Sequence, residues 1–211
     1  MYFEVKADTS EVERMLGDLS GKANLVMARA SNRAAGTAKK TMKQEVAAKY
    51  RIGASTVGNT LEVRNANRNR PFAVVVSKGY HSGLEKFKVS PFRAVRFSGQ
   101  EGRKRPSPGV YKAAVKKGEG LKGLGKRAFV ATMGNGHTGI FRRTDRTQAK
   151  GNAKRRSKRS NSGIIEGLYG PSVPQIIGNK EVMRKVEAAS GKMLHERIEH
   201  EVDVILEKYA D

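Results

Sequence analysis

The chain has 211 residues, of which 42 are Lys or Arg and 20 are Asp or Glu, so its formal net charge at pH 7 is +22. It contains no Cys, which excludes disulfides and thiolate metal sites, and no apolar run approaches the roughly 18 residues of a membrane span. Such an excess of positive charge predicts a polyanionic partner, and the composition favours DNA or RNA over an anionic membrane or an acidic protein surface.

The first fifty residues predict a short strand followed by helices. Residues 1–7 alternate between apolar and polar side chains, a period of two that is typical of a strand. Residues 8–11 then offer N-cap side chains and an acidic first helical turn. Apolar residues recur at helical spacing as far as Tyr50, with an interruption at Ser20 and Gly21. We expect two helices, or one helix that is kinked near Gly21.

Residues 60–142 predict strands. Short β-like runs are separated by Gly, Ser, Asn and Pro, and the β-branched run 74–76 is the strongest of them. Basic loops, 99–109 and 116–127, lie between the runs. The order of helices, strands and helix predicts an α+β fold with N-terminal helices, a central antiparallel β-sheet with long basic loops, and a long C-terminal helix.

The segment 142–162 is polar and carries no apolar periodicity. It has a single acid, Asp145, and an ordered core would be hard to form there, so we expect an exposed, flexible basic loop at 143–162. The candidate residues for contact with a nucleic acid or an acidic partner are its bases: Arg142, Arg143, Arg146, Lys150, Lys154, Arg155, Arg156, Lys158 and Arg159.

The last segment predicts a long helix that begins near Lys180, with Asn179 as its cap. The charges from Glu181 to Asp211 sum to −3, against +25 for residues 1–180. The predicted apolar stripe consists of Val182, Val186, Met193, Leu194, Ile198, Val202, Ile205 and Tyr209. This helix is therefore the acidic part of a basic chain.

Two segments imitate catalytic or metal-binding motifs. In HERIEH, residues 195–200, the histidine spacing does not match the H-E-x-x-H motif of zinc metalloproteases. His195 and His200 would point about 140° apart on the helix. In MGNGHTG, residues 133–139, no Lys-Ser or Lys-Thr follows, so a tight hairpin explains the glycines better than a phosphate loop. His137 has no obvious carboxylate to orient it. We expect no enzyme, no cofactor and no metal.

The run KRRSKRS, residues 154–160, has two readings. Charged runs are commonly solvated loops, whereas a functional run would contact phosphates and release counterions, which makes binding dependent on salt. No aromatic residue interrupts the run, so base stacking is not expected. Contact with phosphates or with an acidic protein is favoured, and sequence-specific reading is not.

Three stretches together resemble the phage minor tail protein Z family: residues 23–57, 127–144 and 164–178. Their order and spacing match the family from about residue 10 to the end, although the basic loop between the second and third stretches departs from its pattern. The family-motif residues are Asn32, Phe129, Gly136, Gly139, Phe141, Arg142, Tyr169, Gly170, Pro171 and Ser172.

The resemblance implies a single tail-completion domain over residues 1–211, acting at the head–tail junction of a long-tailed, non-contractile phage. Related completion proteins form sixfold rings around the DNA channel. The implied partners are further copies in a hexameric ring, the tail tube or terminator, the head connector, and the DNA backbone, with no membrane. The acidic helix and the basic body could supply complementary faces of the ring. A sequence-nonspecific nucleic-acid-binding protein, or a tail terminator or other neck component, are the alternatives.

Overall fold

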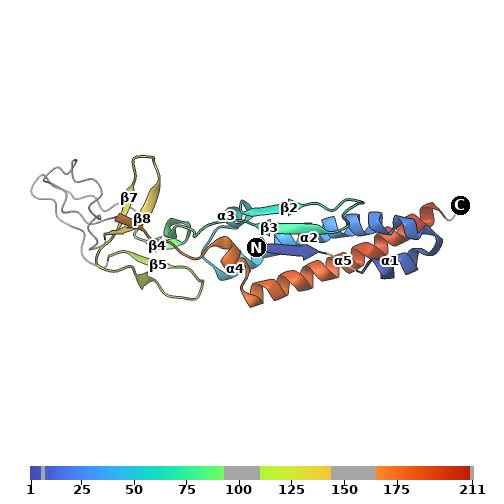
Figure 1. The fold of residues 1–211 in the computed structure, drawn as a ribbon. Coiled ribbons are helices and arrows are strands. Elements are labelled where there is room, and N and C mark those ends of the chain that lie inside the picture. Colours follow the sequence, from blue (N-terminus) through green and yellow to red (C-terminus); the bar gives the residue numbers. More distant parts are fainter. Residues whose placement is uncertain (6–7, 93–109, 144–164, 210–211) are drawn as a thin grey trace, which may run out of the picture. The chain divides into compact units, whose positions relative to one another are not determined.

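The structure of the chain, a computed structural model, describes residues 1–5, 8–92, 110–143 and 165–209. It divides into two compact units. Unit 1 comprises Met1–Ala48, Gly53–Tyr80 and Ser172–Asp211, and unit 2 comprises Lys49–Ile52 and His81–Pro171. The α+β class is confirmed, with a long helix near each end of the chain and small antiparallel sheets between them (Figure 1). The single domain over residues 1–211 stays a prediction.

Unit 1 combines helices with one sheet. Its elements are β1 (Tyr2–Val5), α1 (Thr9–Leu16), the 3-10 helix η1 (Gly17–Lys22), α2 (Ala23–Lys49), α3 (Ala54–Gly58), β2 (Leu61–Arg64), β3 (Ala73–Ser77), α4 (Val173–Ile177) and α5 (Lys180–Lys208). The predicted strand at the N-terminus and the predicted long helix at the C-terminus are confirmed.

The start of α1 and the break after it follow from local chemistry. Asp8 caps α1 by accepting a hydrogen bond from the backbone N–H of Ser10 at 3.0 Å. The pKa of the Asp8 carboxyl lies below its usual range, because the Ser10 hydroxyl and then this N–H donate to it. The helix ends at Gly17, whose φ of +53° suits glycine. The break therefore comes four residues before Gly21, and η1 separates two helices.

Helices α2 and α5 run antiparallel, as two ion pairs show. Arg29 on α2 lies 3.0 Å from Glu201 on α5, and Glu45, further along α2, lies 2.7 Å from Lys185, near the start of α5. Asn179 caps α5 by accepting from the N–H of Glu181 at 3.1 Å, which confirms the predicted cap. The wholly buried small residues of α2 let its neighbours approach closely: Ala30, Ala34, Ala35 and Ala38.

The C-terminal helix buries most of its predicted stripe. Val182, Val186, Leu194, Ile198, Val202 and Ile205 are buried. Met193 is half-buried and Tyr209 is exposed, so the stripe is narrower than predicted. A carboxylate, Glu201, is buried on the same side of the helix.

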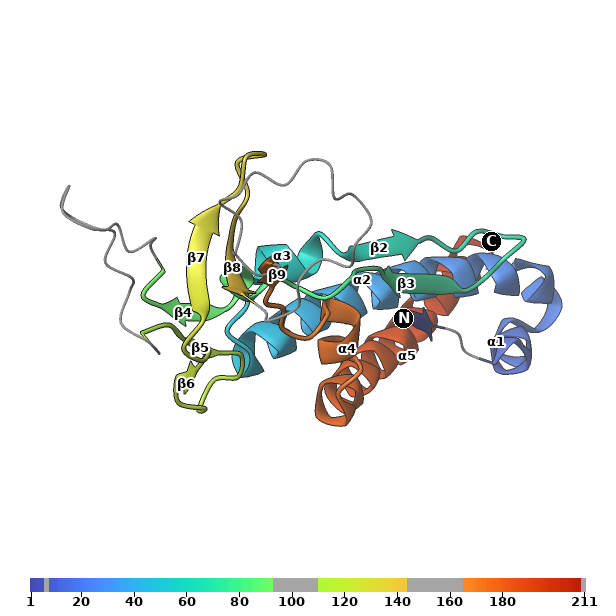
Figure 2. The ribbon, with the colours of Figure 1, turned by 60° about the vertical axis from the view of Figure 1, so that its left-hand side comes forward.

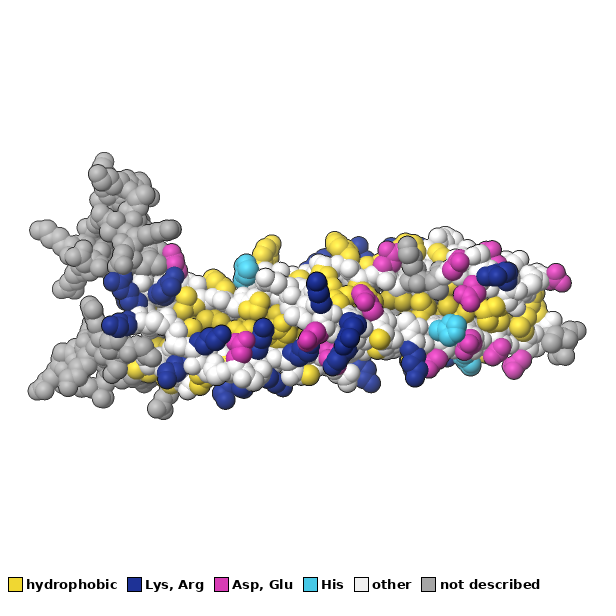
Figure 3. Space-filling model, turned by 90° about the horizontal axis from the view of Figure 1, so that it is seen from below, with side chains coloured by type: hydrophobic (Ala, Val, Ile, Leu, Met, Phe, Trp, Pro, Cys, Tyr) yellow, Lys and Arg dark blue, Asp and Glu magenta, His cyan; other side chains and the backbone are white. Residues whose placement is uncertain are grey.

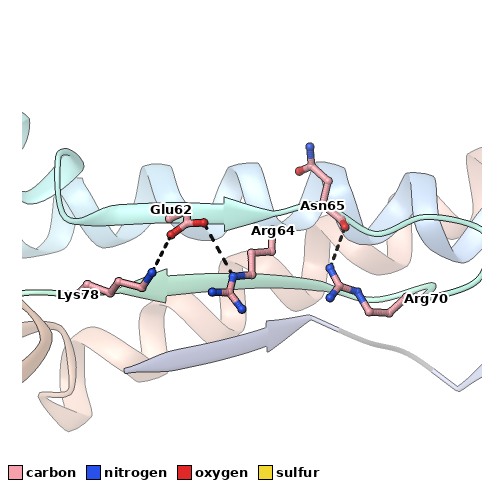
Figure 4. Close-up of polar contacts among 5 residues, drawn as sticks. All are labelled: Glu62, Arg64, Asn65, Arg70 and Lys78. Carbon is pink, nitrogen blue, oxygen red and sulfur yellow. Dashed lines mark hydrogen bonds and ion pairs between the residues drawn. The ribbon is translucent and has the colours of Figure 1, made fainter.

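The sheet of unit 1 has the strand order β1-β3-β2, with both pairings antiparallel. Figure 2 shows β2 and β3 side by side. One face of this sheet carries polar side chains: Glu62 lies 3.2 Å from Lys78 and 3.9 Å from Arg64 (Figure 4). All three side chains are about half exposed or more, so these ion pairs add little stability. They mark a solvated face.

Unit 2 is built from short strands. Its elements are the 3-10 helix η2 (Leu84–Lys86), β4 (Lys88–Ser90), β5 (Lys112–Ala114), β6 (Lys122–Gly123), β7 (Ala128–Thr132), β8 (Thr138–Arg143) and β9 (Ile165–Gly167). They form two antiparallel sheets, β4-β5-β6 and β7-β8-β9. The backbone of Gly83 bridges to that of Tyr169, which ties η2 to the end of β9. The predicted central sheet is thus three small sheets across the two units.

Candidate nucleic-acid interface

The positive charge of the chain is concentrated in unit 2. The residues of unit 2 include 24 Lys or Arg and 5 Asp or Glu, a net of +19, whereas the residues of unit 1 sum to +3. Unit 1 is therefore nearly neutral, and a polyanion would be attracted mainly to unit 2. The low charge of the final helix accounts for only part of this difference in net charge between the two units.

Two of the nine predicted contact residues lie within the described part of the chain, at the end of β8. Arg142 is about half exposed and lies 3.8 Å from Glu166 on the neighbouring strand β9. The guanidinium of Arg143 lies 5.5 Å from the centre of the Phe129 ring. The other seven are outside the described residues: Arg146, Lys150, Lys154, Arg155, Arg156, Lys158 and Arg159.

The two most basic connections of unit 2 both join antiparallel partner strands. Residues 93–109 connect β4 to β5, whose ends pair at Ser90 and Lys112, and residues 144–164 connect β8 to β9, which pair at Arg143 and Ile165. The first connection carries five bases and one acid, and the second carries seven bases and one acid. Each connection, including the predicted loop at 143–162, therefore leaves and re-enters the small-sheet scaffold of unit 2.

The scaffold itself presents bases that sequence reasoning missed. Lys88 and Lys112 are exposed, and the register of β4 and β5 places them on one face of that sheet. The described residues of unit 2 include only three acids, Glu85, Glu119 and Glu166, and each already lies near a basic side chain. The sequence signal was present, because Lys88 and Lys112 alternate with apolar residues, but the strands are only three residues long.

The glycine-rich segment 133–139 forms the predicted hairpin between β7 and β8. Thr132 pairs with Thr138, the N–H of Met133 donates to the carbonyl of His137 at 2.8 Å, and Gly136 adopts a φ of +81°. The segment joins two strands, so its glycines serve the turn. The Nε2 of His137 lies 3.9 Å from the Glu85 carboxylate, which is near it but beyond hydrogen-bond distance.

The family-motif residues of unit 2 mainly support the scaffold. The rings of Phe129 and Phe141 lie on paired strands with their centres 6.1 Å apart. A Cβ on Gly139 would lie 3.1 Å from the Phe141 ring, and one on Gly170 would lie 2.6 Å from the ring of Phe87. A side chain at Gly170 would force the Phe87 ring to shift, and one at Gly139 would make a tight contact with the Phe141 ring. Tyr169 differs from them, because it is 64% exposed.

Pro171 is half-buried and directly precedes Ser172, the N-cap of α4. The Ser172 hydroxyl accepts a hydrogen bond from the N–H of Gln175 at 3.3 Å. Asn32, on α2, makes a two-way contact: its amide donates to the carbonyl of Ala66 at 3.1 Å, and its oxygen accepts from the N–H of Ala66 at 2.7 Å. Ser172 and Asn32 thus form hydrogen bonds that hold backbone groups in place.

In the zinc-like segment of α5, His195 Nε2 lies 3.4 Å from the carboxylate of Glu199, one helical turn further along the helix. In the ranges that the structure describes, no three His, Asp or Glu side chains gather as a metal site would require. No helix within those ranges is long and apolar enough to cross a membrane.

The chain was compared with protein-family models, with curated proteins and with solved structures. The family model described as prophage minor tail protein Z matches residues 11–209, which is nearly the whole chain. Neither the curated proteins nor the solved structures gave a match.

Proposed function

The chain belongs to the prophage minor tail protein Z family, and we propose that it completes the head-proximal end of a long, non-contractile tail so that the tail can join the head. Membership makes it a structural phage tail protein and a component of the virion. The finer role is supported by the separation of charge, because a net of +19 in unit 2 suits a part that surrounds DNA.

In this role several copies, six by analogy with related completion proteins, form a ring around the DNA channel. Unit 2 faces the channel, and Lys88, Lys112 and the loop at 143–162 contact phosphates without reading bases. The nearly neutral unit 1 then carries the contacts with neighbouring copies, the tail tube or terminator, and the head connector. Each copy must present two different patches, because a ring is held by heterologous interfaces.

The test is joining of heads and tails in vitro. Tails assembled without this protein are expected to have normal length and to fail to join, and adding the purified chain should restore joining. A chain with Arg155, Arg156, Lys158 and Arg159 reversed to Glu should restore it poorly, since its positive charge toward DNA is lowered by eight. The matched control reverses four exposed bases of unit 1: Arg14, Arg68, Lys180 and Arg184.

The results of the joining assay distinguish the proposed role from its alternatives. Tails that join normally without the protein contradict the proposal, and tails of uncontrolled length would indicate a tail terminator instead. Equal joining by the loop variant and the wild type would show that the loop makes no functional contact with DNA. Tight DNA binding by an isolated monomer, with no effect on joining, would favour the general nucleic-acid-binding alternative.

A further inference from the structure

Helix α2 exposes one narrow basic stripe. Arg29, Arg33, Gly36 and Lys40 are exposed, and their spacing of four, three and four residues places them on one line along the helix. Arg33 and Lys40 form no ion pair with any acid among the described residues. We call this line of residues the basic stripe.

Gly36 lies in the middle of this stripe, and no contact within its own chain explains why this residue is a glycine. A Cβ at this position would meet no atom within 4 Å, so nothing in the fold requires the missing side chain. Glycine within a helix costs about 0.5–1 kcal/mol relative to alanine. A bare position on an exposed helix face allows another backbone to approach closely, which favours docking of a second helix there.

The stripe also borders a positively charged depression, which is lined by Arg29, Asn32, Arg33, Arg197 and Glu201. The buried Glu201 accepts from Arg29 at 3.0 Å and from Arg197 at 2.8 Å. One carboxylate thus pairs with two guanidinium groups, whose side chains are 51% and 38% exposed. Arg33 adds a third positive charge to the lining. Free N–H donors remain at the surface, and they suit planar carboxylates.

A complementary line lies on α5. Glu196, Glu199, Asp203 and Glu207 are all exposed, and their spacing of three, four and four residues places them on the side of α5 opposite its buried residues. Acidic side chains gather at the end of unit 1 where the C-terminal part of α5 lies (Figure 3). This line is the acidic stripe. Each stripe extends over about eleven residues, or about 16 Å of helix.

We infer that the basic stripe of one copy binds the acidic stripe of α5 in a second copy of this chain. Charge, periodicity and length agree between the stripes, and Gly36 provides the point of closest approach. The stripes are different surfaces, so each copy can bind one neighbour through each of them, which is the requirement of a ring. The inference rests on the proposed ring and assigns its interface.

A DNA backbone is the less favoured occupant of the basic stripe. Unit 1 has a net charge of only +3, and its exposed acids would repel phosphates. The test below distinguishes the two occupants.

The test uses the purified full chain and a pair of charge reversals, Arg33→Glu and Asp203→Lys. Neither side chain has an ion pair among the described residues, so neither reversal removes an ion pair of the fold, and helical circular dichroism checks that each variant is folded. Each variant alone places like charges opposite each other and should weaken self-association about tenfold or more at low salt. In an equimolar mixture, the new glutamate at position 33 meets the new lysine at position 203, while the native pair forms at the alternate contacts. Association measured by sedimentation should therefore return.

Matched controls are Arg184→Glu and Glu187→Lys, which reverse exposed charges on α5 outside both stripes and should leave association unchanged. The inference is overturned if the stripe variants associate as the wild type does, if mixing fails to restore association, or if the wild type stays monomeric at about 100 μM. A stripe that binds DNA would lose DNA affinity in Arg33→Glu, and mixing would not restore it. Joining assays with the loop variant test the proposed function separately from this interface.

Discussion

At the scale of single residues, Asn32 shows what a polar side chain in an Ala-rich helix can do. Its amide and its carbonyl oxygen both bind the backbone of Ala66, which follows β2, and the neighbouring Ser31 donates to the carbonyl of Pro71 at 3.1 Å. The connection from β2 to β3 is thus fastened to α2 near both of its ends. The polar groups of Asn32 are thus used within its own chain, at the Ala66 backbone.

Replacing Asn32 by Leu should lower the free energy of unfolding of unit 1 by about 1–3 kcal/mol, because the polar groups of Ala66 are left without their partners. Asn32→Asp keeps the acceptor and removes the donor, so its effect should lie between those of Leu and Asn. Urea denaturation followed by helical circular dichroism measures the change. Asn24→Ala, at an exposed position of the same helix, is the control. Equal midpoints for Asn32→Leu and the control would refute the role of the contact.

Gly170 gives a second prediction at this scale. An added methyl group would lie 2.6 Å from Cε2 of the buried Phe87, so Gly170→Ala should destabilise unit 2 by about 1–3 kcal/mol. Gly120→Ala is the matched control, since its Cβ would meet nothing within 4 Å. Thermal unfolding compares the two, and a Gly170→Ala variant as stable as the control would show that the ring of Phe87 moves aside without cost.

At the scale of elements, local signals in the sequence located most helices and strands. The caps Asp8 and Asn179 and the hairpin glycine Gly136 act over a few residues, so sequence patterns were sufficient to predict them. Elements of two to five residues, such as β4, β6, β9, α3 and α4, are too short to show a periodicity. The division of the strands into three sheets depends on pairings between distant segments, which no local pattern reveals.

The burial of Glu201 was also hidden from sequence reasoning. No local pattern marks it as buried, because its partner Arg29 is 172 residues away in the chain. The nearer partner, Arg197, lies one helical turn before it. Similarly, the basic stripe of α2 became visible only when burial on the other sides of that helix was known.

The tie between α2 and α5 gives the prediction at this scale. Glu201→Gln removes the charge that holds two guanidinium groups, and it should lower the free energy of unfolding by about 1–3 kcal/mol. Glu199→Gln, at an exposed position of the same helix, should change it by no more than about 0.5 kcal/mol. Urea unfolding of both variants supplies the comparison. An equal effect of the two substitutions would mean that burial does not strengthen the contact.

At the scale of the whole molecule, the two units differ in net charge. Unit 2 carries a net of +19 on small sheets and their connections, while unit 1 is nearly neutral and bears opposite charges on two exposed helical stripes. Composition alone predicted a polyanionic partner but could not say which part of the chain meets it. The location of seven of the nine predicted contact residues outside the described ranges leaves their contact with DNA as a prediction.

The affinity of the full chain for DNA should fall steeply as the salt concentration rises, and it should not depend on the DNA sequence. Reversing Arg155, Arg156, Lys158 and Arg159 to Glu should reduce the slope of log K against log salt by about 0.9 for each phosphate that the variant no longer neutralises. The same reversal of Arg14, Arg68, Lys180 and Arg184 in unit 1 should reduce it much less. Titrations of two unrelated duplexes at several salt concentrations provide the slopes. A strong preference for one duplex, or equal slopes for both variants, would contradict backbone contact by unit 2.

The proposed position of this protein is the junction of tail and head. Cryo-electron microscopy of the particle's neck, with a label fused to this chain, tests it most directly. We expect label at the head-proximal end of the tail, in a ring whose DNA-facing side is formed by unit 2. Label at the tail tip or along the tail tube, with none at the neck, would contradict the claim.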